Sequence, residues 1–322
     1  MNLHNDIEAF LALLKDVRLQ TGMRSDIAEK DYYVTLLLSE LSTKQSRLPA
    51  YFKGGTALYK ALGQMKRFSE DIDLTVESED CSRSQAHKRL KNATQNYTAL
   101  PRTSDSTMEE VNRGSITSVY TYEPVAEIPS ADPLERFGKV KIEATSFTKS
   151  IPHKALQIAP LVYSLATQEQ RGILEGRYGV RPFKIQTITM ERIFVDKILA
   201  AEFYYEQRKL MDVAKHLYDL TAMVKQDEIK RLLNNKSQFA VMLGYKREEE
   251  TRRFGSNLAT KPLAEFALYK MIGKEAALKS AFSQMQTVYV FDERYLVMFD
   301  DVSQRMNELF NRLLSLDPLT DA

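Results

Sequence analysis

The chain has 322 residues, of which 43% are hydrophobic and 27% charged, and its formal net charge is only +2. This is the composition of a globular chain with one large domain or two of ordinary size. The near balance of charge excludes a strongly basic protein, so any contact with nucleic acid needs a local basic surface. The single Cys81 excludes an intrachain disulfide and a cysteine-based zinc site. No apolar run reaches about 18 residues and no secretory signal is visible, so we expect a cytoplasmic protein without a membrane partner.

Apolar residues at helical spacing predict a first helix over residues 3–19 and a second from about residue 25 to residue 41. The second helix contains the charged run Glu29-Lys30-Asp31, followed by two tyrosines. We interpret it as a packing helix whose charge cluster faces solvent, because charge runs are usually solvated.

The stretch from Tyr51 to Leu74 is the most informative part of the sequence. An apolar strand leads into a Gly-Gly turn, the turn opens a short helix, and the next strand carries Asp71 and Asp73. Side chains two residues apart on a strand point the same way, so both carboxylates are placed to bind a hard cation such as Mg²⁺. The glycines allow backbone N–H groups to approach an anion at the start of the helix. The stretch therefore suits a phosphate-binding turn followed by a metal-binding strand, while each piece alone also fits an ordinary turn or a solvated strand end.

The order strand, Gly54-Gly55-Thr56, helix and Arg67-x-Ser69-x-Asp71-x-Asp73 resembles the nucleotidyltransferase superfamily of the DNA polymerase β type. More closely, it resembles the AbiEii/AbiGii family of nucleotidyl transferase toxins, over roughly residues 25–220. The resemblance implies that Asp71 and Asp73 are catalytic metal ligands for Mg²⁺. It also implies a nucleotide-binding set on this part of the chain, made of Lys53, Gly54, Gly55, Thr56, Arg67 and Ser69.

Further elements follow this motif. A polar helix over residues 82–99 carries Arg83, Lys88, Arg89 and Lys91, which either face phosphates or are simply solvated. Strands over residues 107–111 and 115–122 flank Asn112-Arg113-Gly114, a hairpin signal.

Residues 137–145 alternate as a strand, with Glu143 on the polar side. In polymerase-β-like folds a third acidic ligand comes from a later strand that lies beside the strand of the paired aspartates, so the resemblance implies that Glu143 is a catalytic metal ligand. The alternative is a solvent-facing residue on a half-exposed strand, and the residues alone leave both open.

The second half of the chain has helical character. Glycines and Pro182 break any long helix over residues 150–185, so we expect an irregular segment with short strand pieces at Ile158 and over residues 161–163. Helices are expected over residues 187–207, 212–224, 226–234, 237–250, 261–284 and 292–316. We therefore predict an α+β fold. An N-terminal polymerase-β-like nucleotidyltransferase domain with a mixed sheet takes residues 1–165, and a mainly α-helical C-terminal domain takes residues 166–322.

Two residues of the helical half match later motifs of the toxin family. The resemblance implies that Lys197 is catalytic and binds the triphosphate. From the residues alone, Lys197 is a lysine on the helix surface that forms a charged pair with its neighbour in the sequence. It also carries over Asp219 as catalytic, either as an anchor for the lysine or as a proton acceptor. Basic residues between Tyr245 and Lys261 form either an RNA-contacting patch or a solvated helix face.

Together, the motifs imply the toxin of a toxin–antitoxin system of the phage-defence type. Such a toxin is an Mg²⁺-dependent nucleotidyltransferase that moves an NMP from an NTP to an acceptor, such as the 3′ end of a tRNA or another RNA, and a cognate antitoxin neutralises it. Two alternatives remain open: transfer to a protein side chain (AMPylation), and a non-catalytic nucleotide-binding module. The complete glycine turn and paired carboxylates argue against the module.

Overall fold

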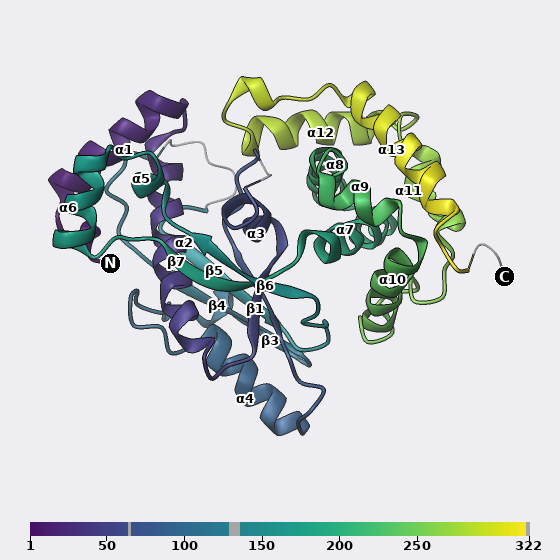
Figure 1. The fold of residues 1–322 in the computed structure, drawn as a ribbon, viewed down its shortest axis with the longest axis horizontal. Helices are drawn as coiled ribbons and strands as arrows, with labels where there is room; N and C mark the ends of the chain where they lie inside the picture. Colours follow the sequence, from purple (N-terminus) through teal and green to yellow (C-terminus); the bar gives the residue numbers. More distant parts are fainter. Residues whose placement is uncertain (64–65, 129–135, 320–322) are drawn as a thin grey trace. The chain divides into compact units, whose positions relative to one another are not determined.

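The computed structural model describes residues 1–63, 66–128 and 136–319. The chain divides into two compact units and passes between them several times (Figure 1). The first unit contains residues 1–61, 69–146 and 153–187, and the second contains residues 62–68, 147–152 and 188–322. The single domain boundary placed between residues 165 and 166 remains a prediction.

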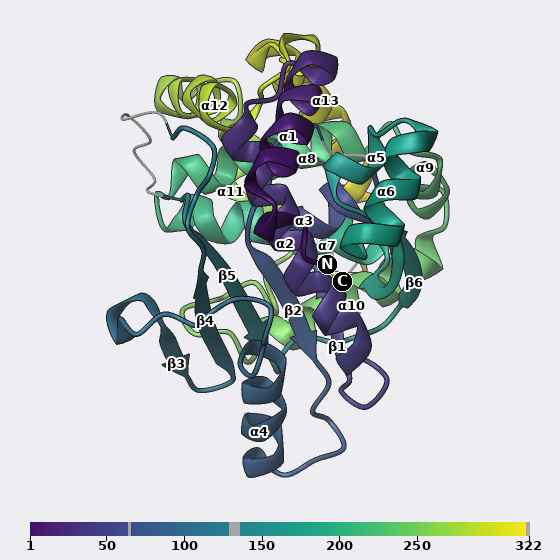
Figure 2. The ribbon, with the colours of Figure 1, turned by 90° about the vertical axis from the view of Figure 1, so that its left-hand side faces the viewer.

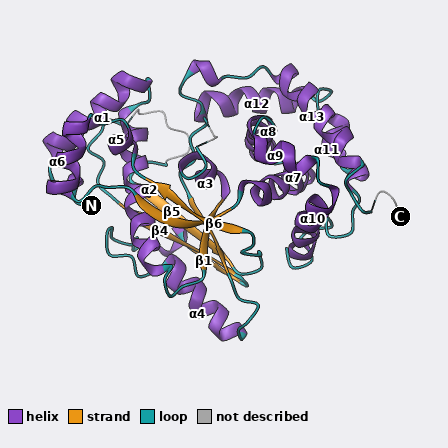
Figure 3. Cartoon of the chain, in the orientation of Figure 1, coloured by secondary structure: helices purple, strands orange, loops and turns teal. Residues whose placement is uncertain are grey.

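One mixed sheet lies in the first unit (Figure 3). In the described residues it has seven strands, in the order β3-β4-β5-β2-β1-β7-β6. β1 runs antiparallel to β2 and parallel to β7, β2 runs parallel to β5, and β4 runs antiparallel to both β5 and β3. The strands are β1 (Ala50–Lys53), β2 (Ile72–Val76), β3 (Glu110–Asn112), β4 (Ser115–Thr121), β5 (Lys139–Thr145), β6 (His153–Ile158) and β7 (Phe183–Ile188). The mixed sheet and the β3–β4 hairpin expected from the sequence are confirmed.

The two faces of this sheet differ in character. Ile72 pairs with Ile142 on the neighbouring strand, and both side chains are buried. The helix α4 (Arg83–Thr94) covers this apolar face (Figure 2), where the Tyr120 hydroxyl donates to the carbonyl of its last residue, Thr94, at 2.9 Å. Because side chains alternate along a strand, Asp73 projects from the opposite face. The polar face therefore carries the predicted metal ligands.

The remaining helices of the first unit are α1 (Ile7–Thr21), α2 (Ser25–Lys44), α3 (Gly54–Lys60), α5 (Leu161–Ser164) and α6 (Gln168–Tyr178). Over residues 150–185 the prediction is partly wrong: the strand piece expected at Ile158 lies in β6, but residues 161–163 belong to α5 and the helix α6 was not predicted. Helix α6 contains two interior glycines, each of which costs only about 1 kcal/mol. A capping box between Thr167 and Gln170 starts the helix, and burial of Leu174 stabilises it.

The second unit is built from helices. They are α7 (Met190–Glu206), α8 (Leu210–Met223), α9 (Asp227–Leu233), α10 (Lys236–Glu250), α11 (Ala267–Met271), α12 (Ala276–Tyr289) and α13 (Phe299–Leu314). The single helix predicted over residues 261–284 is wrong, since α11 and α12 are separated there by Gly273, whose φ is +85°. Within the described parts of the chain, no helix is both long and apolar enough to cross a bilayer.

Candidate active site

The glycine turn and the second acidic residue are in direct contact. Gly54 has φ +77°, and a Cβ added there would lie 2.1 Å from Oδ2 of Asp73. Only a residue without a side chain allows the carboxylate to lie against the backbone at this point. Asp73 therefore lies at the start of α3, where the first backbone N–H groups have no intrahelical acceptor. This is the arrangement of turn and carboxylate that the sequence predicts.

Thr56 connects α3 to the start of β2. Its buried hydroxyl hydrogen-bonds the backbone carbonyl of Asp71 at 2.5 Å and lies 3.0 Å from the hydroxyl of Ser69. Thr56 and Ser69 were both predicted to contact nucleotide. Their hydroxyls contact each other here, and the pair fixes the position of Asp71 relative to α3.

A row of charged residues crosses the polar face of the sheet. Lys53 on β1 pairs with Asp73 on β2, which pairs in turn with Glu143 on β5. Neighbouring strands lie about 4.8 Å apart, so these side chains are adjacent. The Lys53 ammonium donates to the hydroxyl of Thr145, on the same face, at 3.1 Å. Glu143 is exposed and pairs with Asp73 on the neighbouring strand, which is where the resemblance implies a third acidic residue; its role as a ligand stays a prediction.

These residues fit a magnesium ion by their chemistry. Mg²⁺ usually binds one or two carboxylates and completes its octahedral shell with water and substrate phosphates. Asp73 and Glu143 offer two carboxylates from adjacent strands, and Asp71 directly precedes β2. In the described ranges, no three histidine, cysteine, aspartate or glutamate side chains gather closely enough to hold a metal on their own. A metal here would therefore share its ligands between the protein and a bound nucleotide.

We expect Gly54→Ala to impair nucleotide transfer far more than it impairs folding. The new methyl group displaces the Asp73 carboxylate, and the positive φ adds strain of about 1–2 kcal/mol. Gly22→Ala is the matched control, because Gly22 has φ +73° and no neighbouring atom within 4 Å. Urea unfolding should show similar losses of stability in both variants, with transfer lost only in Gly54→Ala. Full activity in Gly54→Ala would contradict the role of this contact.

Helix α2 supplies two buried charged residues, one of which binds the residue before Asp71 and the other the end of α3. Lys30 pairs with Glu70, the residue before Asp71, at 3.3 Å and also donates to the carbonyl of Arg136. Asp31 pairs with Lys60, the last residue of α3, at 2.5 Å. The same carboxylate accepts from the backbone N–H of Leu161 at 2.8 Å. Consecutive residues of one helix thus fix the start of β2 and the end of α3.

The prediction that this charge cluster faces solvent is wrong. Glu29, Lys30 and Asp31 are each at most 2% exposed. They are buried because each has a partner from a distant part of the chain, and Glu29 accepts from the backbone N–H groups of Val125 and Ala126. Burial lowers the pKa of Lys30 and raises that of Glu70, while the charge of each partner opposes the shift.

Lys30→Met should lower the free energy of unfolding by about 2–3 kcal/mol, because it leaves the buried Glu70 without its cation. The loss stays moderate because Glu70 takes up a proton more readily once Lys30 is gone. Urea denaturation of the single and double variants with Glu70→Gln measures the coupling. Lys88→Met, an exposed lysine on α4, is the control and should cost almost nothing. A loss below about 0.5 kcal/mol for Lys30→Met would contradict the assignment.

A second cluster lies within the second unit and contains the other predicted residues. Arg67 donates to both carboxylate oxygens of Asp219 at 2.6 Å, and Lys197 pairs with Asp219 at 2.6 Å. Lys197 lies on α7 and Asp219 on α8. All three side chains are buried, so the alternative of a surface lysine at position 197 is excluded.

The charges of this cluster are mutually dependent. Burial alone would raise the pKa of Asp219, but the Arg67 guanidinium and the Lys197 ammonium outweigh it and lower the pKa to about 2. His216, three residues earlier on α8, stacks on Tyr204 with ring centroids 5.5 Å apart. Its pKa is well below the ordinary value because of burial and the nearby Lys197 cation, so the imidazole is neutral. Sequence reasoning assigned His216 no function.

The basic residues between Tyr245 and Lys261 are mostly paired with acids. Lys246 pairs with Glu250 at 2.6 Å, and Arg247 with Asp317 at 2.7 Å. Lys261 contacts Glu202 at 2.8 Å. Both earlier interpretations of this segment fail to anticipate these ion pairs, one of which lies within α10, while the other two join α10 to Asp317 and α7 to Lys261.

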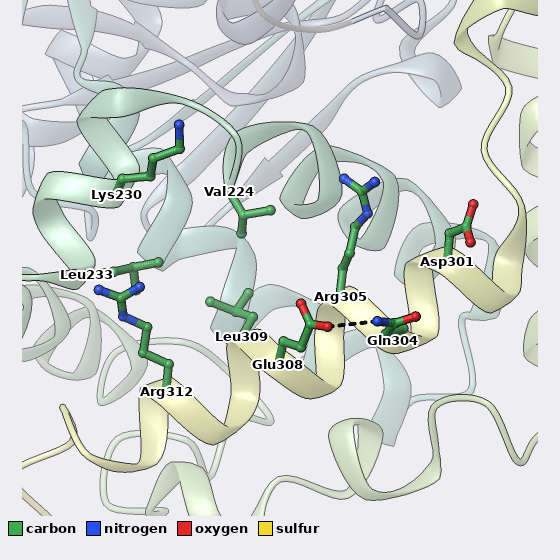
Figure 4. A pocket seen from close by; sticks show the side chains of 9 residues that line it. All are labelled: Val224, Lys230, Leu233, Asp301, Gln304, Arg305, Glu308, Leu309 and Arg312. Atoms are coloured by element: carbon green, nitrogen blue, oxygen red, sulfur yellow. Dashed lines mark hydrogen bonds between the residues drawn. The ribbon is translucent and has the colours of Figure 1, made fainter.

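A cavity of about 530 Å³ lies in the second unit, against α9 and α13 (Figure 4). None of the predicted site residues lines it. Its charged lining residues are of both signs: Lys230, Arg305, Arg312, Asp301 and Glu308. This mixture gives no preference for a polyphosphate, and we do not place the nucleotide there.

Comparison with known proteins decides the family. The family described as "Nucleotidyl transferase AbiEii toxin, Type IV TA system" matches residues 36–295, which is most of the chain. The chain belongs to this family. Among solved structures, the fold is similar to MenT4, the nucleotidyltransferase toxin Rv2826c from Mycobacterium tuberculosis H37Rv, with 15% identity and a TM-score of 0.48. That similarity covers 92% of this chain and 98% of the MenT4 chain. No curated protein matches the chain.

Membership of the AbiEii family confirms the predicted family and enzyme class. The protein is a nucleotidyltransferase toxin of a type IV toxin–antitoxin system. A transferase of this class takes a nucleoside triphosphate as its substrate, and the toxin has a cognate antitoxin.

Proposed function

We propose that this AbiEii-family toxin transfers an NMP from an NTP to the 3′ end of an RNA such as tRNA, in an Mg²⁺-dependent reaction that serves phage defence. The contact between Gly54 and the Asp73 carboxylate is the observation that carries the proposal. It joins an anion-binding turn to a metal-binding carboxylate, which is what a metal–triphosphate substrate requires.

The residues of the first unit take the following roles in the proposal. Asp73 and Glu143, with Asp71, bind Mg²⁺, which when bound lowers the negative charge of the triphosphate and activates the acceptor hydroxyl. Backbone N–H groups of Gly54 and Gly55 bind the phosphates. The acceptor hydroxyl releases its proton to solvent as its oxygen bonds to the α-phosphorus, the bond from that phosphorus to the β-phosphate oxygen breaks, and pyrophosphate leaves.

The second cluster also has a place in the proposal. Lys197 binds a phosphate oxygen, and Asp219 acts as its anchor rather than as a proton acceptor. The 2.6 Å ion pair and the low pKa of Asp219 favour this choice, because a carboxylate with a pKa near 2 is a weak base. Arg67, predicted to contact nucleotide, orients the Asp219 carboxylate through two hydrogen bonds.

The test is to incubate the toxin with each α-labelled NTP, Mg²⁺, and either total RNA or total protein. We expect label at RNA 3′ ends with at least one NTP, and none after chelation by EDTA. Label in protein would replace this proposal with AMPylation. The absence of label from both acceptors with all four nucleotides would contradict the proposed transfer and favour a binding module.

A further inference from the structure

Strand β5 carries two lysines on the same face as the proposed metal ligands. Asp73 pairs with Glu143 and Ile72 with Ile142. This register places Lys141 beside Asp71, the residue before β2. Lys139 lies two residues further along β5 and therefore projects from the same face. The strand thus presents two cations in line with the carboxylate of Glu143.

Within the described ranges, neither lysine has an ion-pair or side-chain hydrogen-bond partner. Opposite-charge pairs across strands stabilise sheets, but Lys141 faces Val119 and Lys139 faces Thr121 on β4. Among the described residues, neither lysine makes an ion pair or a side-chain hydrogen bond, and Lys141 is exposed. This contrasts with Lys30, Lys60 and Lys197, which are all paired with carboxylates. Asp71 is the neighbour of Lys141 across the strands and Glu143 lies on the same face, yet neither lysine makes an ion pair with a described carboxylate.

We propose that Lys139 and Lys141 bind the phosphodiester backbone of the RNA acceptor strand beside the carboxylates. This inference rests on the proposed function, because it assumes that the acceptor hydroxyl reacts at the Asp73 site. An RNA that presents a terminal hydroxyl there brings its backbone phosphates with it, whereas a protein hydroxyl brings none. Lysine binds phosphate as a point charge without reading the base, which suits a contact to the backbone.

The test compares two double variants that remove equal charge. Lys139→Gln with Lys141→Gln removes the proposed contact, and Lys88→Gln with Lys91→Gln removes two exposed lysines of α4, on the opposite face of the sheet. Transfer of labelled NMP to total bacterial RNA is measured for both and for the wild type over a range of salt concentrations. Circular dichroism and melting temperature check that the variants are folded.

We expect the β5 variant to raise the KM for RNA about tenfold and to make its dependence on log salt shallower by about 1.4, since each single-strand phosphate contact contributes about 0.7. The KM for the NTP should stay unchanged, and the α4 variant should behave like the wild type. If the wild type labels RNA and the β5 and α4 variants behave alike, or if the NTP KM rises as well, this inference is overturned while the proposed function stands. If the wild type labels protein or nothing, the proposed function fails first and the inference with it.

Discussion

Asp73→Asn should abolish nucleotide transfer, with a fall in kcat of at least about 10³-fold, while the fold stays intact. Asparagine keeps the shape of the side chain against Gly54 but removes the negative charge that faces the proposed metal. A metal ion contributes several kcal/mol to the stabilisation of the transition state, and each 1.36 kcal/mol is a factor of ten in rate. Transfer of label from NTP to RNA, and growth arrest on expression in cells, are the two measurements.

The matched control for Asp73→Asn is Glu110→Gln. Glu110 is an exposed carboxylate on the edge strand β3, paired with Thr117. It belongs to the same sheet but does not contact the glycine turn, so we expect full transfer and full toxicity. Circular dichroism should give superimposable spectra for both variants and the wild type. A folded Asp73→Asn protein that remains toxic would remove Asp73 from the catalytic set.

The glycine turn and the paired aspartates could be recognised from the sequence because they lie close together along the chain. A glycine turn, a short helix and two acids spaced by one residue form one unit, and the distance between turn and acid is short along the chain. The residues alone do not predict the register that brings Glu143 beside Asp73, since Glu143 lies 70 positions after Asp73 and hydrophobic patterning does not choose strand neighbours. The residues alone therefore name a candidate carboxylate, and only the family resemblance implies that its strand lies beside that of Asp73.

The buried charges show a different limit. Three consecutive charged residues on a helix point in three directions, which normally places at least some of them in solvent. Lys30 and Asp31 are buried because their partners come from positions 106 and 130 residues further along the chain. Likewise, Arg67 lies four residues before Asp71, yet its guanidinium binds Asp219, 152 residues away. Ion pairs between residues this far apart in the sequence depend on the tertiary structure, and no local sequence pattern predicts them.

The last of these pairings gives the largest expected effect on stability. Asp219→Asn should lower the free energy of unfolding by about 4–5 kcal/mol, because it leaves two buried cations, Arg67 and Lys197, without a counter-charge. Urea denaturation at neutral pH measures the loss. Asp227→Asn is the control, since Asp227 pairs with Lys230 on the exposed surface and such pairs contribute little.

The pH dependence of stability separates a lost charge from a lost hydrogen bond. The pKa of Asp219 is about 2 in the folded protein against the ordinary value of 3.8, so its carboxylate stabilises the fold above pH 3.8. That contribution, about 2 kcal/mol at 1.36 kcal/mol per unit, is lost as the pH falls from 3.8 towards 2. The Asn variant, which has no proton to take up at this position, should lack this part of the acid sensitivity. If wild type and variant lose stability in parallel over that range, Asp219 is not held as a charged anchor, and the proposed positioning of Lys197 by ion pairing fails.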